Sequence, residues 1–296
     1  MSSERFPESL DIDLVPTERL VEIIQDQDRS VAEAVAAQRP SIVRAIDAIA
    51  DRMLDGGRLF YVGAGTSGRI AAVDASEIPP TFGTAPEMVQ VIMAGGEAAF
   101  TSAAEGAEDD EEAAVRAIDE RVRAEDVVVG IAASGTTPFT VMAVRRANML
   151  GALTLAVTSR AGSPLSREVD IAIAVETGPE VIMGSSRMKS GTAQKLVLNT
   201  ISTGIMIRMG RVYSNLMIEM PATNIKLRDR AVRMIELAAG VGRAEAERAF
   251  AESGSSVKVA AVMAKLGLSR ADAEGRLASS GGRLRDVFGE SGKTRP

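Results

Sequence analysis

Three short segments rich in glycine and hydroxyl side chains could hold an anion. The first glycine segment, residues 63–69 (GAGTSGR), follows the apolar run 59–62 and precedes a helical pattern. The N–H groups at a helix start carry partial positive charge, glycine lets the backbone approach a ligand, and Thr and Ser add hydroxyl donors. The second (133–138, ASGTTP) and third (184–192, GSSRMKSGT) glycine segments also precede predicted helices. The pattern predicts a site for a phosphate or phosphosugar.

The first glycine segment also fits G-x-G-x-x-G, the fingerprint of dinucleotide-binding proteins. A Rossmann site needs an acidic residue at the end of the second strand, whereas here Glu87 precedes that strand and residues 94–96 (AGG) follow it. The motif therefore favours a single phosphate over a dinucleotide. Two simpler interpretations stay open, namely a tight strand-to-helix turn without a ligand and ordinary capping of each helix.

Carboxylates are the groups best suited to proton transfer in this chain. Cys, His and Trp are absent, which excludes thiolate nucleophiles, His-based triads and thiolate or imidazole metal sites. Tyr61 falls in a predicted core strand, so Asp and Glu lead as acid or base. Glu77 precedes a Pro-Pro pair (79–80) that we expect to end its helix, and Glu105 and Glu108 precede another helix. Each acid alone would be interpreted as an exposed side chain.

Strands alternate with helices through the middle of the chain. Five apolar runs predict strands, at 58–63, 88–93, 127–132, 153–157 and 171–175. Helical patterns lie between them, and a long apolar helix is predicted at 187–209. This alternation predicts an α/β fold with a parallel sheet flanked by helices. The three glycine segments should then converge at the carboxyl edge of the strands, where open sheets bind ligands.

Helical patterns flank this α/β region on both sides. Thr17 and Ser30 are candidate N-caps of two helices that end before Gly56. Towards the other end, residues 240–257 align without gaps on 267–284, and this repeat predicts a small helical bundle. We therefore expect a helical lead-in (1–55), a central α/β domain (56–224) and a C-terminal helical bundle (225–296).

Charge and hydropathy limit the classes of partner. The 296-residue chain has a net charge of −6 and no basic stripe, which argues against nucleic acid. No apolar run approaches the roughly 18 residues that span a bilayer, and the start lacks a signal-peptide pattern. We expect a cytoplasmic protein with a small-molecule partner and no membrane contact. Because the long helix is apolar on most faces, it should be buried in the domain or against a second copy, and we favour a homodimer.

Residues 63–83, 105–109 and 184–195 together closely resemble the N-acetylmuramic acid 6-phosphate etherase family. The resemblance spans nearly the whole chain and implies a flavodoxin-like, three-layer sugar-isomerase-type domain. It also implies cleavage of the lactyl ether at C3 of the phosphosugar, giving N-acetylglucosamine 6-phosphate and D-lactate during cell-wall recycling, without a metal or redox cofactor. In one departure, Thr136 stands where the family usually has arginine.

The resemblance carries the family's two catalytic acids onto Glu77 and Glu108. In the ring-opened sugar the C2 proton is acidic, so one carboxylate can remove it while a protonated carboxyl protonates the departing lactate oxygen, after which water adds at C3. We assign Glu77 to the lactyl oxygen and the water, and Glu108 to C2. The residues expected to bind the substrate are Gly65, Thr66, Ser67, Gly68, Ser134, Gly135, Thr136, Thr137, Ser185, Ser186 and Lys189.

Two other functions are compatible with the same sheet. A phosphosugar aldose-ketose isomerase needs a base at C2 but would release no lactate. A non-catalytic phosphosugar-sensing regulator could dispense with Glu77 or Glu108, yet both are present.

Overall fold

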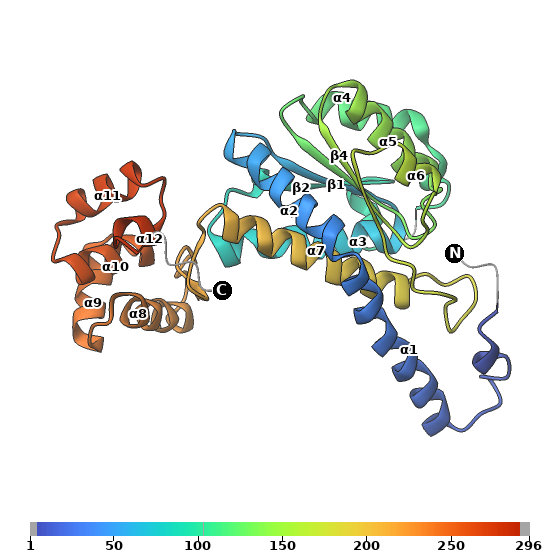
Figure 1. Cartoon of the computed structure of the whole chain (residues 1–296), viewed down its shortest axis with the longest axis horizontal. Coiled ribbons are helices and arrows are strands. Elements are labelled where there is room, and N and C mark those ends of the chain that lie inside the picture. Colours follow the sequence, from blue (N-terminus) through green and yellow to red (C-terminus); the bar gives the residue numbers. More distant parts are fainter. Residues whose placement is uncertain (1–4, 103, 291–296) are drawn as a thin grey trace. The chain divides into compact units, whose positions relative to one another are not determined.

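A five-stranded parallel sheet lies at the centre of the first part of the chain. The structure is a computed structural model that describes residues 5–102 and 104–290. The strand order is β2-β1-β3-β4-β5 (Figure 1), which is the flavodoxin-like order. The strands are β1 Leu59–Gly63, β2 Val89–Met93, β3 Val127–Ile131, β4 Leu153–Thr158 and β5 Ile171–Ala174. The predicted parallel α/β sheet is confirmed, with each strand within one or two residues of its expected bounds.

Helices cover both faces of this sheet, with α4, α5 and α6 on one face and α2, α3 and α7 on the other (Figure 1). Alternate residues of β1 serve the two faces: Phe60 and Val62 pack in the core with α4 and α5, whereas the Tyr61 hydroxyl donates to Asp74 of α3. The helices are α1 Thr17–Ala37, α2 Arg39–Leu54, α3 Gly65–Phe82, α4 Glu111–Arg121, α5 Pro138–Met149, α6 Pro164–Arg167 and α7 Lys189–Arg208. Short 3-10 helices are η1 Pro7–Ser9, η2 Pro86–Met88, η3 Glu97–Phe100 and η4 Ala107–Asp109.

Two predicted helix boundaries are wrong. Ser30 does not start a helix, because α1 runs through it and its hydroxyl donates to the carbonyl of Gln27 (2.7 Å). The break comes at Arg39, where Pro40 occupies the first turn of α2 and its missing N–H is not needed. The Pro-Pro pair 79–80 likewise lies inside the last turn of α3, which continues to Phe82.

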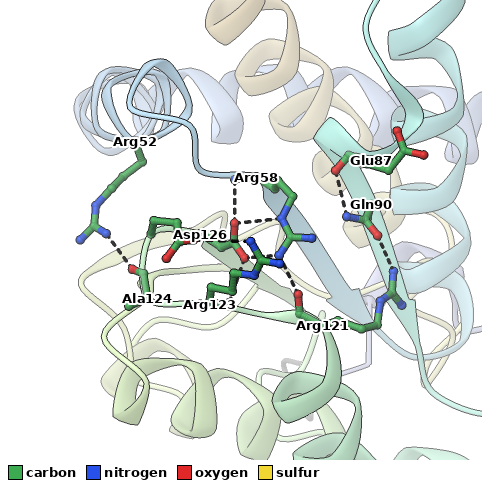
Figure 2. A network of polar contacts seen from close by, with 9 residues as sticks. Arg52, Arg58, Glu87, Gln90, Arg121, Arg123, Ala124 and Asp126 are labelled. Atoms are coloured by element: carbon green, nitrogen blue, oxygen red, sulfur yellow. Dashed lines mark hydrogen bonds and ion pairs between the residues drawn. The ribbon is translucent and has the colours of Figure 1, made fainter.

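An ion pair joins the amino ends of β1 and β3 (Figure 2). The carboxylate of Asp126, only 1% exposed, accepts hydrogen bonds from the backbone N–H of Arg58 (2.8 Å) and of Arg123 (2.9 Å) and from the Arg58 guanidinium (2.7 Å at Nη2). Arg58 also donates to the carbonyl of Arg121 (2.8 Å), whose own guanidinium reaches Gln90 (3.0 Å). This network fixes the edge of the sheet opposite the glycine segments.

The remaining described residues form a helical region with a small two-stranded sheet. Its elements are β6 Val212–Tyr213, β7 Leu216–Met217, α8 Ile225–Ala239, α9 Arg243–Glu252, α10 Val257–Leu266, α11 Arg270–Ser279 and α12 Leu284–Val287. The repeat appears as two matching helix ends, because α8 and α10 both end at a left-handed glycine (Gly240 and Gly267). Salt bridges from Arg243 to Glu247 and from Arg270 to Glu274 then follow in α9 and α11.

The chain divides into two compact units, which differ from the three predicted domains in their limits. The first contains Met1–Ser76 and Pro86–Ile205, and the second contains Glu77–Ala85 and Met206–Pro296. The boundaries expected at 55 and 224 stay a prediction. Among the residues that the structure describes, no helix combines the length and apolar character needed to cross a membrane.

The Asp126 ion pair should make stability depend on pH. Burial raises the pKa of Asp126, but hydrogen bonds from Arg58 and Arg123 outweigh it and hold the pKa below its ordinary value. The pair therefore stabilises the fold above the unfolded pKa of about 3.9, and this contribution is lost as the pH falls through the folded pKa. Asp126→Asn should lower the free energy of unfolding by about 2–4 kcal/mol at pH 7.

Denaturant unfolding of both proteins at several pH values checks this prediction. The deficit of Asp126→Asn should shrink as the pH falls below about 4, because the unfolded wild type protonates this carboxyl there and the folded wild type follows below its lowered pKa. Asp119→Asn is the matched control, because its ion pair with Arg146 is exposed and should contribute less than about 1 kcal/mol. A deficit that stays constant down to pH 2 would contradict the role of the charge.

Candidate active site

The first glycine segment forms a close contact between β1 and the start of α3. A Cβ atom at Gly68 would lie 2.1 Å from Sδ of Met93 and 2.9 Å from the carbonyl oxygen of Gly63. A Cβ atom at Gly63 would lie 3.0 Å from the N atom of Gly68. These two glycines therefore allow the first turn of α3 to rest directly on the strand. Gly65 differs, because it is exposed, has a φ of +53° and has open space beside it.

The second glycine segment lies beside the first, because β1 and β3 are neighbours with Gly63 opposite Ile131. β2 lies on the other side of β1, so this is the point where the chain order of the sheet reverses, the usual ligand position in such folds. Gly135 has a φ of +65°, and a Cβ there would lie 2.2 Å from Oγ of Ser163.

The hydroxyl groups of the second segment are partly paired with one another. Ser134 Oγ accepts hydrogen bonds from the backbone N–H (3.2 Å) and the hydroxyl (2.9 Å) of Thr136. Thr137 stands at the N-cap of α5 without a side-chain capping bond. Ser134 and Thr137 are half-buried and Thr136 is exposed, so this loop offers hydroxyl groups at the edge of the sheet.

The third glycine segment differs from the other two because a carboxylate of the protein already occupies its helix start. Glu180, 5% exposed, accepts hydrogen bonds from the backbone N–H groups of Lys189 (3.0 Å) and Ser190 (2.9 Å) at the beginning of α7. Sequence reasoning missed Glu180. Its one available signal is an acidic residue shortly before a helix start, a position where negative charge is favourable. Ser185 and Ser186, which precede the helix, are half-buried.

Lys189 is engaged within the fold. Its side chain is buried, and Nζ donates to Oε1 of Gln27 on α1 (2.8 Å) and to the carbonyl of Pro179 (3.1 Å). Burial lowers the pKa of Lys189, and the carboxylates of Glu180 and Asp28 oppose that shift. The structure therefore gives Lys189 a role in holding α1 against the start of α7.

Helices α3 and α7 lie side by side below the sheet. A Cβ at Gly191 would lie 3.7 Å from Cγ2 of Thr66, which brings the start of α7 next to the first glycine segment. Further along, the buried carboxylate of Asp74 accepts hydrogen bonds from Tyr61 (2.9 Å), Asn199 (2.5 Å) and Ser202 (3.0 Å). This buried network fixes α3 against both β1 and α7.

A cavity of about 360 Å³, here called the α3 cavity, lies where β1 and β2 end. The start of α3, the end of β2 and the segment around η4 all contribute to its lining. Gly65 and Glu108 therefore border the same cavity. The residues that line it are Ala64, Gly65, Arg69, Met93, Ala94, Ala99, Ala104, Glu105, Gly106, Ala107 and Glu108. Both glutamates are exposed at its rim.

Glu77 is not among the described residues that line the α3 cavity. It is exposed on α3, about three turns and 18 Å along the helix axis from Gly65 at about 1.5 Å per residue. The second and third glycine segments also contribute no lining residue among those described. Of the residues predicted from sequence, the cavity therefore joins Gly65 and Glu108.

Arg69 is a residue of the site that sequence reasoning did not select. It lines the α3 cavity, and its guanidinium donates hydrogen bonds to the carbonyls of Phe100 (3.1 Å from Nε) and Ser102 (2.8 Å from Nη2). Arg69 thereby ties the start of α3 to the segment that follows β2. Its position in the motif GAGTSGR was the only sequence signal.

Comparisons with known proteins first define the class. Residues 103–203 match the SIS domain family, and residues 41–148 match the glucokinase regulatory protein N-terminal SIS domain family. A phosphoheptose isomerase from Francisella tularensis has the same fold, with a TM-score of 0.51 and 18% identity over 65% of this chain and 98% of that one. The fold is that of a SIS-domain protein.

Curated relatives then give the family. A protein of Symbiobacterium thermophilum named N-acetylmuramic acid 6-phosphate etherase is 57% identical over 87% of this chain and 86% of its own length. A protein of the same name from Salmonella choleraesuis is 48% identical over 96% of both chains. The chain belongs to the N-acetylmuramic acid 6-phosphate etherase family.

The close contact at Gly68 predicts that any side chain there is destabilising. Gly68→Ala should lower the free energy of unfolding by about 1–3 kcal/mol, because the added methyl group meets Met93 and the backbone of Gly63. Gly275→Ala in α11 is the control, since a Cβ there meets nothing within 4 Å and should stabilise by about 0.5–1 kcal/mol. Denaturant unfolding measures both, and a neutral Gly68→Ala would contradict the contact.

Proposed function

We propose that this protein cleaves the D-lactyl ether of N-acetylmuramic acid 6-phosphate by elimination and hydration. The products would be N-acetylglucosamine 6-phosphate and D-lactate, in the recycling of cell-wall amino sugars. Membership of the etherase family supports the substrate. The observation that carries the chemistry is the α3 cavity, in which a carboxylate, Glu108, faces the same space as the start of a helix.

The start of α3 is the proposed phosphate site. The backbone N–H groups of its first turn carry partial positive charge, Gly65 leaves room beside them, and Thr66 and Ser67 add hydroxyl donors. The hydroxyl groups of Ser134, Thr136 and Thr137 border the same edge of the sheet. At α7 the carboxylate of Glu180 takes the corresponding position and would repel a phosphate, so Ser185 and Ser186 would act from the side.

Glu108 is the proposed base at C2 of the ring-opened sugar. Once it has taken the C2 proton, electrons move to form the C2–C3 double bond and the C3–O bond breaks. Glu77 would protonate the departing lactate oxygen, then take a proton from the water that adds at C3, while C2 regains a proton. The two steps together add one water and leave the net oxidation state of the substrate unchanged. Side chains that transfer protons can therefore perform them.

We further propose that a second copy of the chain supplies Glu77. Glu77 and Glu108 must reach adjacent carbon atoms of one sugar, yet Glu77 lies about 18 Å along α3 from the residue that borders the cavity. The apolar character of α7 does not itself require a dimer, because Val197, Ile201 and Ile205 are already buried within the chain. The shared site is therefore the physical reason for a homodimer.

Removal of either acid should slow turnover strongly. Glu108→Gln and Glu77→Gln should each lower the rate of D-lactate release from N-acetylmuramic acid 6-phosphate by about 10²–10⁴-fold, since each loses a proton-transfer group. Glu112→Gln is the control, because its side chain is 90% exposed on α4 and should leave the rate unchanged. Circular dichroism checks that all three variants fold.

Near-normal lactate release by either variant would refute the assignment of that acid. A wild-type protein that isomerises phosphosugars without releasing lactate would instead identify the isomerase alternative. Binding of the phosphosugar with no turnover at all would identify a sensor.

A mixture of the two inactive variants tests the shared site. If one subunit supplies Glu77 and the other Glu108, a mixed dimer contains one intact site. Random exchange of subunits in a two-fold dimer should then restore about a quarter of wild-type activity. The measurement is lactate release after the two variants are unfolded and refolded together. Dimers that form without any recovery would show that each chain supplies both acids to its own site.

A further inference from the structure

The α3 cavity is lined by a positive charge that the proposed reaction does not use. Glu105 and Glu108 place two carboxylates at its rim, and Arg69 is the one cation among the described residues that line it. A catalytic base at C2 accounts for Glu108. The cation next to it needs a reason of its own, because the proposed phosphate site uses the backbone at the start of α3.

Arg69 is held in a fixed orientation. Its Nε donates a hydrogen bond to the carbonyl of Phe100, and its Nη2 donates one to the carbonyl of Ser102. Both carbonyls belong to the segment between β2 and η4. The remaining N–H groups of Arg69 have no acceptor among the described residues. A guanidinium fixed by two neutral carbonyls keeps its full charge and its remaining donors for another acceptor.

The proposed substrate carries a second anion that fits this position, an argument that rests on the proposed function. The lactyl group is bonded through its ether oxygen to C3, the neighbour of the carbon from which Glu108 removes a proton. Its carboxylate therefore lies within a few bonds of C2, and a sugar whose C2 faces Glu108 would place it in the cavity that Glu108 and Arg69 both line. Arginine binds carboxylates strongly because its planar N–H groups match the two oxygens.

We propose that Arg69 binds the carboxylate of the lactyl group and makes the site specific for an acid-bearing ether. Without this cation the substrate carboxylate would face two carboxylates, Glu105 and Glu108, with no compensating charge. Specificity then has two parts. The guanidinium attracts the substrate carboxylate, and the two acids repel that carboxylate wherever it is not paired with Arg69. The same contact positions the ether carbon C3 beside the base.

The test compares two substrates, N-acetylmuramic acid 6-phosphate and its lactamide, in which a neutral carboxamide replaces the carboxylate. Release of lactate or lactamide gives kcat/KM for each. Wild-type protein should prefer the acid. Arg69→Gln should lower kcat/KM for the acid by about 10- to 100-fold, the usual loss of a hydrogen bond to a charged group. The loss for the amide should be much smaller, so that the preference disappears.

Two further variants separate recognition from structure. Arg69→Lys keeps the charge but not the planar donors, so it should retain part of the preference. Arg116→Gln is the matched control, because that arginine is 61% exposed on α4 and should leave the preference unchanged. A structural role for Arg69, confined to holding residues 100–102, would lower kcat/KM for both substrates equally.

An active wild type whose preference for the acid survives in Arg69→Gln would overturn this inference and leave the proposed function intact. An equal loss on both substrates would also overturn it. Wild-type protein that releases product from neither substrate would overturn the proposed function, and the role of Arg69 with it.

Discussion

The site depends on how closely the first turn of α3 can approach the end of β1. A helix start attracts an anion only if its N–H groups reach the ligand, and here they lie at the carboxyl edge because Gly63 and Gly68 have no side chains between strand and helix. The buried carboxylate of Asp74 then holds α3 against β1 and α7 through Tyr61 and Asn199. The position of the helix start is thus set by packing and by a buried polar network together.

The starts of α3 and α7 differ in whether a carboxylate of the protein already lies beside them. α7 begins on the carboxylate of Glu180, which satisfies its first N–H groups internally. α3 begins at an exposed glycine with open space beside it. A phosphate would therefore meet backbone N–H groups with open space beside Gly65 at α3, and a like charge at α7. At the opposite edge, the Arg58–Asp126 pair joins β1 and β3, the two strands that lead into the first and second glycine segments.

Much of the sheet could be predicted from sequence because each strand is a short apolar run between turn residues, and such runs have few alternatives. The helix boundaries were harder, since Ser30 can cap a helix or bond back to Gln27 within one, and only the fold decides. Pro79 and Pro80 were misread for a similar reason, because proline is tolerated where few helical bonds remain to be made.

The site was predictable only where a residue's partner is close in sequence. Glu108 was chosen through the family resemblance, whereas the glycine segments fall into this group. Glu180 and Arg69 do not, because a capping carboxylate nine residues away and a guanidinium that bonds to carbonyls some thirty residues on leave no periodic pattern. Glu77 could be chosen only by resemblance, because it lies about three turns along α3 from Gly65 and is not among the described residues that line the α3 cavity.

The most direct test of the whole account is a crystal structure of the Glu108→Gln variant with N-acetylmuramic acid 6-phosphate bound. We expect the phosphate oxygens within about 3 Å of the backbone N–H groups at the start of α3. We also expect C2 of the sugar to face residue 108. A phosphate bound at the start of α7, or a sugar outside the α3 cavity, would contradict the account.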